Sequence, residues 1–323
     1  MRRIQAEEAL TDEETKELAG ELLTDAHYDT LISGEDAEVL KPDGSPLIQF
    51  RHKVLTPSKC SAAYKGLRKA AAESDNRGVA AGLIEKDDPA LLQIMEQEGA
   101  TDIVYSAGKT RYRMVTATGY VSNTQRAKRV RSGIVGFFDR NPRLPYCRMT
   151  AFNMREPEKF ASAVPVIQEC DRVFAEAVPE RYAFQKEFAE RTSSDFLIPQ
   201  TAFSTVTVNR NWQTAVHRDK GDLKGGFGCL TAFSAGEYDG CYLIFPKFRV
   251  AANIRSGDVC LADVHEWHGN SPIRRNTRAY DRVSLVLYYR ERMAECGSAV
   301  EELSRAKNLE RNRLVVEVES ATD

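Results

Sequence analysis

The chain has 323 residues, 42% of them hydrophobic, and a formal net charge of −2 at pH 7. This length and composition allow a sizeable core in one large domain or two smaller ones. No run of about twenty apolar residues occurs, and the first residues lack an apolar stretch, so the sequence predicts neither membrane association nor a signal peptide.

Cysteine usage points to a compartment. Seven cysteines are scattered at positions 60, 147, 170, 229, 241, 260 and 296, and none belongs to a C-x-x-C pair. The odd number and the spacing predict reduced thiols in an intracellular protein, cytoplasmic or nuclear (nucleoid), and disfavour a zinc site built from cysteines.

The N-terminal region is acidic. Its first 25 residues hold eight acidic against three basic residues, and Thr11 with Glu14 forms a capping-box motif, so an acidic helix is predicted for residues 1–27. Strand and turn signals then alternate over 28–55, and 101–123 is expected to be β-strand or loop. Helical periodicity marks residues 60–74, 89–99, 156–178 and 181–192.

Short strands separated by turn signals recur from residue 201 to 291. This pattern fits a double-stranded β-helix, a jelly-roll type of barrel. The sequence therefore predicts an α+β fold in which helices buttress a jelly-roll core, within a single domain over 28–295. A charged helical tail is expected over 296–323.

Three of the five histidines fall between residues 217 and 268. His217 and Asp219 are two residues apart, so on a strand both side chains point to the same face. Two imidazoles and one carboxylate form the facial triad that binds Fe(II) and leaves three positions open, two for a bidentate 2-oxoacid and one for O₂. Both His265 and His268 follow an apolar run of strand length; we take His268 as the third ligand and His265 as a neighbouring structural residue.

A further strand over residues 281–289 carries Arg282, fourteen residues after His268. An arginine there can hold the distal carboxylate of 2-oxoglutarate through two parallel, charge-assisted hydrogen bonds. Ser284 lies two residues further on, so it faces the same way and can donate another hydrogen bond.

These motifs together resemble a known family. The order and spacing of His217-Arg218-Asp219, His268-Gly269-Asn270-Ser271-Pro272 and Arg282-Val283-Ser284 are similar to those in the oxygenase core of TET and J-binding proteins, and the resemblance covers about residues 30–293. It implies a Fe(II)- and 2-oxoglutarate-dependent dioxygenase of the microbial or viral branch that oxidises the 5-methyl group of a pyrimidine in DNA, with ascorbate as an optional reductant. By position, it assigns the triad to iron and the Arg282–Ser284 pair to 2-oxoglutarate.

The same resemblance implies residues that contact the base. Asp222 takes the place of a polar residue on the base, Tyr288 that of the stacking ring, and Thr207 that of a small hydroxyl residue behind it. Arg290 stands where cytosine-oxidising relatives often have histidine. Asp222 can accept and Arg290 can donate, and this pair suits either methylated base. We expect oxidation of 5-methylcytosine to 5-hydroxymethylcytosine, and the sequence does not say whether oxidation continues. Thymine is the alternative substrate.

Positive charge is concentrated in one segment. Residues 101–150 carry ten Lys/Arg against two acids, most densely at Arg126, Lys128, Arg129 and Arg131. Beside a base-oxidising core, these four residues are expected to contact DNA phosphates and to position a monomeric enzyme without reading sequence.

Other functions remain compatible with the motifs. An enzyme of the same fold can depend on ascorbate and transfer a carbon fragment onto 5-methylcytosine. A small molecule or a protein side chain is another substrate class, and a non-catalytic reader of modified DNA is a third reading. Dependence of turnover on 2-oxoglutarate, products in DNA and succinate release separate these cases.

Overall fold

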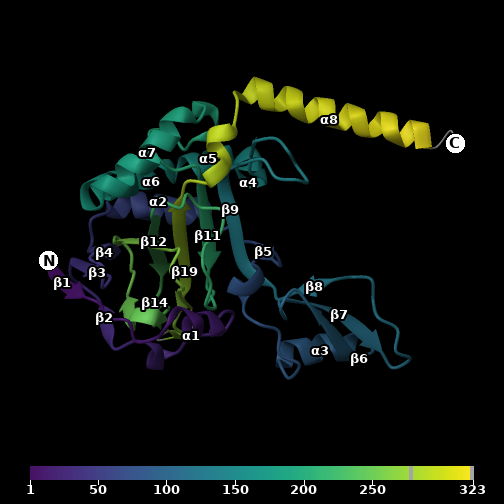
Figure 1. Ribbon diagram of the computed structural model, residues 1–323, viewed down its shortest axis with the longest axis horizontal. Helices are drawn as coiled ribbons and strands as arrows, with labels where there is room; N and C mark the ends of the chain where they lie inside the picture. Colours follow the sequence, from purple (N-terminus) through teal and green to yellow (C-terminus); the bar gives the residue numbers. More distant parts are fainter. Residues whose placement is uncertain (276–278, 321–323) are drawn as a thin grey trace.

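The computed structural model describes residues 1–275 and 279–320 and has two facing β-sheets at its centre (Figure 1). One core cluster joins the sheets, because Phe50 and Cys260 of the larger sheet pack with Leu243, Phe245 and Val250 of the smaller one. The larger sheet has the order β1 (Arg2–Gln5), β3 (Ala37–Leu40), β4 (Pro46–Arg51), β16 (Val259–Ala262), β12 (Gly228–Ala235), β19 (Asp281–Tyr288), β11 (Thr205–Arg210), β9 (Val130–Phe138) and β10 (Arg148–Met149), with β5 (Glu73–Ser74) beside β9. The smaller sheet has the order β17 (Gly269–Asn270), β14 (Leu243–Phe245), β15 (Val250–Ala252) and β2 (Thr30–Ile32), and β13 (Tyr238–Gly240) pairs with β18 (Ile273–Arg275).

The predicted α+β fold with a jelly-roll core is confirmed, although the sheets extend beyond residues 201–291. Strands β2, β3 and β4 near the N-terminus and β9 in the middle of the chain join them. Their partners lie far away in sequence, so local patterning did not reveal that they complete the core.

Strand β19 shows how the sequence divides the two faces of the larger sheet. Val283, Leu285 and Leu287 point into the core beneath the helices. Because side chains alternate along a strand, Arg282 and Ser284 point to the opposite face, into the space between the sheets.

Helices cover the outer face of the larger sheet (Figure 1). They are α2 (Pro57–Leu67), α4 (Ala151–Arg155), α5 (Pro157–Ala161), α6 (Val164–Ala177) and α7 (Pro179–Arg191). The single helix predicted over 156–178 is divided in two, because Pro165 lacks an N–H and restarts the helix in its first turn. The helices predicted over 89–99 and 181–192 are confirmed to within a few residues, whereas the helix predicted over 60–74 ends at Leu67 and residues 73–74 form β5.

The expected helix over residues 1–27 is wrong in extent. Residues 2–5 form β1, which pairs in parallel with β3 and becomes the edge strand of the larger sheet, and the helix α1 spans only Asp12–Glu17. The predicted capping box is present, since Thr11 and Glu14 each accept from the other's backbone N–H. Lys247, which is 8% exposed, pairs with Glu8 and Asp12 at 2.8 Å and fastens this segment to the jelly roll.

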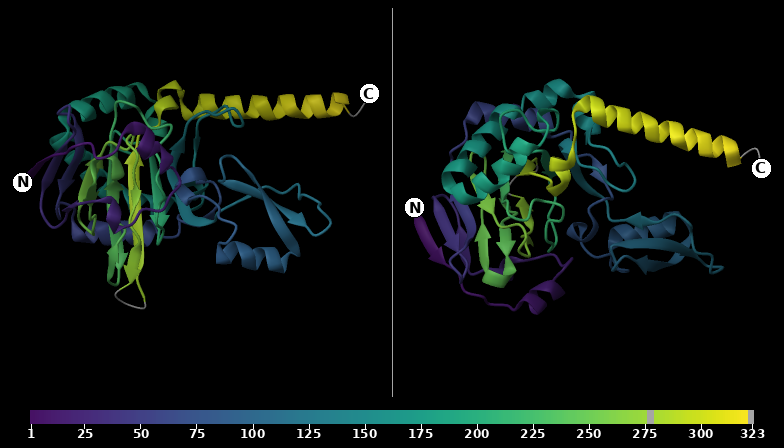
Figure 2. Two further views of the ribbon diagram at one scale, coloured as in Figure 1. Left: turned by 60° about the horizontal axis from the view of Figure 1, so that its bottom comes forward. Right: turned by 45° about the horizontal axis from the view of Figure 1, so that its top comes forward.

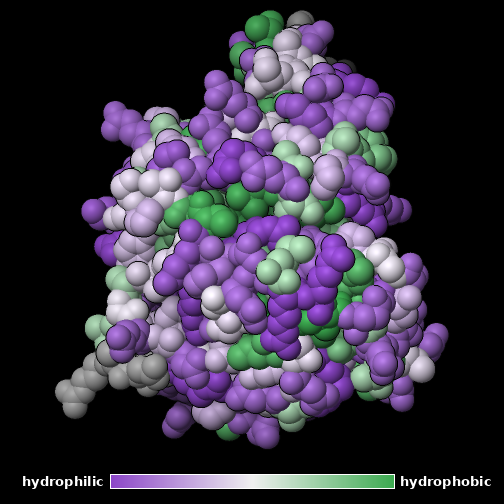
Figure 3. All heavy atoms as spheres, turned by 90° about the vertical axis from the view of Figure 1, so that its left-hand side faces the viewer, coloured by the Kyte–Doolittle hydropathy of each residue, from purple (hydrophilic) through white to green (hydrophobic). Residues whose placement is uncertain are grey.

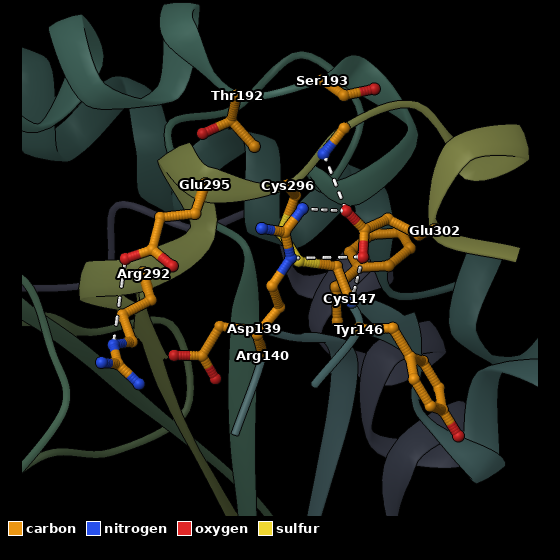
Figure 4. The surroundings of a disulfide bond; sticks show 12 residues. Asp139, Arg140, Tyr146, Cys147, Thr192, Ser193, Arg292, Glu295, Cys296 and Glu302 are labelled. Carbon is orange, nitrogen blue, oxygen red and sulfur yellow. Dashed lines mark hydrogen bonds and ion pairs between the residues drawn. A yellow bond between two sulfur atoms is a disulfide. The ribbon is translucent and has the colours of Figure 1, made fainter. Parts of the chain in front are cut away.

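Two of the seven cysteines form a disulfide, Cys147–Cys296, so the prediction that all are reduced is wrong (Figure 4). The other five are buried free thiols. Beside the disulfide, Glu302 is 2% exposed, pairs with Arg140 and accepts from the backbone N–H of Cys147 at 2.7 Å. Glu302 therefore anchors the start of α8 (Ala299–Ser320), the predicted charged tail, which extends away from the body (Figure 2).

A small unit projects from the jelly roll on the same side as α8 and lies below that helix in Figure 1 (Figures 1 and 2). It contains α3 (Pro89–Gln97), β6 (Ala100–Ser106), β7 (Arg111–Thr116) and β8 (Arg126–Ala127). Ile84, Leu91, Ile103, Tyr112 and Met114 form a hydrophobic cluster of its own.

The face of the molecule nearest β1 is mostly hydrophilic, and its hydrophobic side chains gather in hollows (Figure 3). Within residues 1–275 and 279–320, no helix has the length and apolar character needed to cross a membrane.

Candidate active site

A cavity of about 490 Å³ lies between the two sheets. Its walls come from β11, β12 and β19 of the larger sheet, from β14 and β17 of the smaller sheet, and from the loop before the projecting unit. It brings together all nine residues expected at the iron, 2-oxoglutarate and base sites: Thr207, His217, Asp219, Asp222, His268, Arg282, Ser284, Tyr288 and Arg290.

His217 reaches the cavity from a loop and not from the end of a long strand. Strand β11, which precedes it, ends at Arg210, because Asn211 adopts a left-handed conformation (φ 49°) that turns the chain. The chain then pairs with β17: the backbones of His217 and His268 exchange two N–H···O bonds of 2.9 Å. Asp219 is fixed by its own N–H, which donates to the Val264 carbonyl at 3.1 Å.

The candidate ligand atoms of His217, Asp219 and His268 all lie within 4.8 Å of one another. His265 is not part of this group; its Nε2 lies 3.3 Å from the carbonyl oxygen of Leu223. Of the two histidines that follow the apolar run, His268 is therefore the one that faces His217.

Backbone carbonyls orient both rings. Nδ1 of His217 lies 2.8 Å from the Ala215 oxygen, and Nδ1 of His268 lies 2.9 Å from the Glu266 oxygen. Each Nδ1 must carry the proton to make this bond, which leaves the Nε2 lone pair available for a metal ion.

Electrostatics favour a cation among these three groups. Burial, together with the neighbouring His217, lowers the pKa of His268 to about 4, so its ring is neutral at pH 7 and able to ligate. Burial alone would lower the pKa of His217 and raise that of Asp219. The contact between His217 Nε2 and Asp219 Oδ1 (3.4 Å) outweighs burial, so that the pKa of His217 is raised and that of Asp219 is lowered. A proton or a metal ion is stabilised at this point, and the donor set fits Fe(II).

Arg282 lies 5% exposed on the cavity wall. Its Nη1 donates to Ser284 Oγ at 3.1 Å and its Nε to the Tyr238 hydroxyl at 3.2 Å. Over the described part of the chain, its guanidinium meets no carboxylate. A buried cation without a counter-ion is costly, so the site fits a ligand that brings its own carboxylate.

The groups expected at the base lie on the same wall. Tyr288 is buried and its hydroxyl lies 3.4 Å from Thr207 Oγ1. Arg290 Nε donates to Asp139 at 2.7 Å, and Arg290 pairs through its backbone with Asp222. Burial, together with the neighbouring Asp219, raises the pKa of Asp222 well above its usual range. Its buried Oδ2 has no hydrogen-bond partner within the described structure, so this carboxyl can exchange hydrogen bonds with a bound molecule.

The sequence did not reveal the contribution of Arg77 to this cavity. Arg77 lies in the loop before the 3₁₀ turn Gly78–Ala81, 140 residues from His217, and no motif surrounds it. Trp212 was also missed; it lines the main cavity and a second one beside it.

The four basic residues expected at DNA phosphates divide into two pairs. Arg126 makes two hydrogen bonds with Glu98 at 2.6 and 2.7 Å, and Lys128 lies 3.4 Å from Asp88. Arg129 and Arg131 are exposed and line the second cavity, next to Trp212. The latter pair is therefore better placed for contact with an anionic ligand.

Comparison with known proteins agrees with this geometry. Residues 133–291 match the family model Tet_JBP, described as the oxygenase domain of the 2OGFeDO superfamily. The fold and site define an oxygenase of that superfamily, whose members use Fe(II) and 2-oxoglutarate. More narrowly, residues 133–291 match the oxygenase domain shared by TET and J-binding proteins.

Several relatives share the oxygenase region. The chain is 36% identical over 188 residues to the bifunctional helicase and thymine dioxygenase JBP2 of Leishmania tarentolae, covering 58% of this chain and 16% of that protein. It is 32% identical over 175 residues to the thymine dioxygenase JBP1 of Crithidia fasciculata, covering 53% of this chain and 21% of that protein. The chain thus spans about a fifth or less of the length of these curated relatives.

A solved structure, NgTET1 in complex with 5mC DNA, shares the fold. It is 12% identical, has a TM-score of 0.50, and the match covers 93% of this chain and 100% of that chain.

Proposed function

We propose that this protein is a Fe(II)- and 2-oxoglutarate-dependent dioxygenase that hydroxylates the 5-methyl group of a pyrimidine flipped out of DNA. The observation that carries the proposal is a single cavity that combines a triad able to hold a metal, a buried arginine that meets no carboxylate among the described residues, and a buried tyrosine beside a carboxyl oxygen with no partner in that part of the chain. Relatives that share the oxygenase region are named thymine dioxygenases.

His217, Asp219 and His268 hold the iron, and Arg282 with Ser284 holds the distal carboxylate of 2-oxoglutarate. When bound, the iron would supply activation of O₂, so that one oxygen atom is inserted into the methyl C–H bond and the other ends in succinate as 2-oxoglutarate loses CO₂. The protein positions the methyl group and excludes water from the cavity. Ascorbate serves at most as an accompanying reductant.

Chemistry on a methyl group inside a duplex requires the base to leave the stack. Tyr288 offers a ring for stacking, worth about 1–3 kcal/mol per base, and Thr207 supports it. Asp222 and Arg290 contact the edge of the base. Both 5-methylcytosine, the base first expected, and thymine carry a group that can donate to Asp222.

The DNA backbone passes Arg129 and Arg131, which line the cavity next to the site. Contact with phosphates is independent of sequence, and it fixes the position of the duplex while the cavity reads one base. As part of the same proposal, the protein acts as a monomer in the compartment that holds the DNA.

The test is nucleoside mass spectrometry of duplexes that carry thymine or 5-methylcytosine, incubated with Fe(II) and 2-oxoglutarate. We expect a hydroxymethyl product and an equal amount of succinate, neither of which forms when 2-oxoglutarate is omitted. Turnover that requires ascorbate but not 2-oxoglutarate would replace this proposal by the carbon-transfer alternative. Binding of modified DNA without any product would indicate a reader.

A further inference from the structure

Arg77 is a cation in the cavity that neither the metal nor the 2-oxoglutarate site uses. Its Nη2 donates to the Gly133 carbonyl at 3.1 Å, which holds the side chain against β9. Its Nε is buried and has no hydrogen-bond partner within the described structure. A guanidinium is always charged and can only donate, so this N–H is available to an acceptor on a bound molecule.

The surroundings of Arg77 locate that acceptor. Burial lowers the pKa of Arg77, and the groups whose charge opposes this effect are Tyr288 and Asp219. Arg77 also lines the same cavity as Tyr288, the ring expected to stack on the base, and Asp219, one ligand of the metal triad. Arg77 and Arg282 both line this cavity, but only Arg282 is bonded to the residues of the expected 2-oxoglutarate site, Ser284 and its neighbour Tyr238. Arg77 is therefore free for a different contact.

The chemistry of the pyrimidine ring then narrows the contact. The carbon that carries the reacting methyl group is bonded to C4, so the substituent on C4 is the exocyclic group nearest the methyl. When the methyl faces the metal ligands and the ring stacks on Tyr288, a donor close to both Asp219 and Tyr288 faces that substituent. In thymine it is a carbonyl, which accepts; in 5-methylcytosine it is an amine, which donates.

We propose that Arg77 is a specificity-determining residue that donates to the C4 carbonyl of thymine, so that this protein prefers thymine to 5-methylcytosine. The inference rests on the proposed function and names its substrate. Asp222 is compatible with this contact, because its unsatisfied Oδ2 can accept from thymine N3–H, but it suits either base, so the discrimination comes from Arg77. With 5-methylcytosine, Arg77 would instead oppose an amine, two donors without an acceptor, and such a mismatch leaves a buried group unpaired.

The test compares the kcat/KM of wild type and Arg77→Gln on two duplexes that differ only in the target, thymine or 5-methylcytosine, by nucleoside mass spectrometry. We expect wild type to favour thymine, and the ratio of thymine to 5-methylcytosine to fall about tenfold or more in Arg77→Gln. The ratio should fall for two reasons: the glutamine offers the thymine carbonyl only a neutral donor in place of a charged one, and its amide oxygen can accept from the cytosine amine. Arg172→Gln, which removes an exposed arginine paired with Glu176 on α6, is the matched control and should leave the ratio unchanged.

The outcomes separate the two proposals. Equal losses on both duplexes would overturn the inference, because they would assign Arg77 to a phosphate or to 2-oxoglutarate, and a raised KM for 2-oxoglutarate would identify the latter. An unchanged ratio, or a wild type that favours 5-methylcytosine, would also overturn it while the proposed function stands. A wild type that oxidises neither base overturns both. Arg77→Lys keeps a charged donor and should keep the thymine preference, which covers the case in which the glutamine variant does not fold.

Discussion

The arginine that is expected to bind 2-oxoglutarate offers a prediction that can be worked through in numbers. Arg282 is 5% exposed and makes bonds only to neutral partners, the Ser284 and Tyr238 hydroxyls, among the hydrogen bonds of its described side chain. In the variant Arg282→Gln, the fork of two charge-assisted hydrogen bonds to the distal carboxylate is removed, and one neutral hydrogen bond remains.

The magnitude follows from these bonds. Hydrogen bonds to charged groups contribute about 1.5–3 kcal/mol each, so the fork contributes about 3–6 kcal/mol and the glutamine recovers about 1 kcal/mol. A loss of at least about 2 kcal/mol weakens the binding of 2-oxoglutarate about thirtyfold or more. Thermal stability without 2-oxoglutarate should hardly fall, because the variant also removes an uncompensated buried charge.

The assay is isothermal titration of 2-oxoglutarate into metal-loaded protein, with differential scanning calorimetry of the same samples. Arg249→Gln is the matched control, because Arg249 pairs with Asp29 at the surface of the jelly roll, outside the cavity. If Arg282→Gln bound 2-oxoglutarate as tightly as wild type, or lost several kcal/mol of stability, the residue would be structural and the assignment wrong.

Three further predictions follow from other parts of the structure. His268→Ala should abolish succinate release with the fold retained by circular dichroism, whereas His265→Ala should keep most activity; the reverse result would exchange the two assignments. Replacing Arg129 and Arg131 by glutamine should weaken binding of all duplexes alike and lower the slope of log affinity against log salt by about one for each phosphate that the variant no longer binds; unchanged slopes would remove both residues from the DNA site. Reduction of the disulfide should destabilise the protein by about 2–4 kcal/mol, measured by urea unfolding with and without reductant, and identical curves would contradict a stabilising bond.

The parts of the fold that depend on local patterns were predictable. The period of two in β19 places Arg282 and Ser284 on the face opposite Val283 and Leu285, and the structure has this arrangement. The capping box at Thr11 also formed as expected.

The parts that failed depend on distant partners. Strand β1 exists because the edge of β3 is available to it, and the local sequence, with its acidic helix-like composition, contains no sign of that edge. Likewise, Cys147 and Cys296 are 149 residues apart and meet only because the chain folds back there. Scattered cysteines carry no information about such a pairing.

The residues of the site divide in the same way, into those that local motifs predicted and those that only the folded chain brings together. Motifs with short spacing identified the residues expected at the metal and at 2-oxoglutarate, and the cavity contains all of them. Arg77 was missed because a single arginine in a loop has no periodicity or spacing, and only the packing of that loop against β9 brings it to the cavity.

The central claim is that His217, Asp219 and His268 hold one ferrous ion to which 2-oxoglutarate can chelate. Its most direct test is an anaerobic titration with Fe(II) and 2-oxoglutarate, followed by the visible absorption of the Fe(II)–2-oxoacid chelate. We predict that the band saturates at one iron per chain in wild type and is absent in His217→Ala. Saturation of the same band in His217→Ala, or no band in wild type, would contradict it.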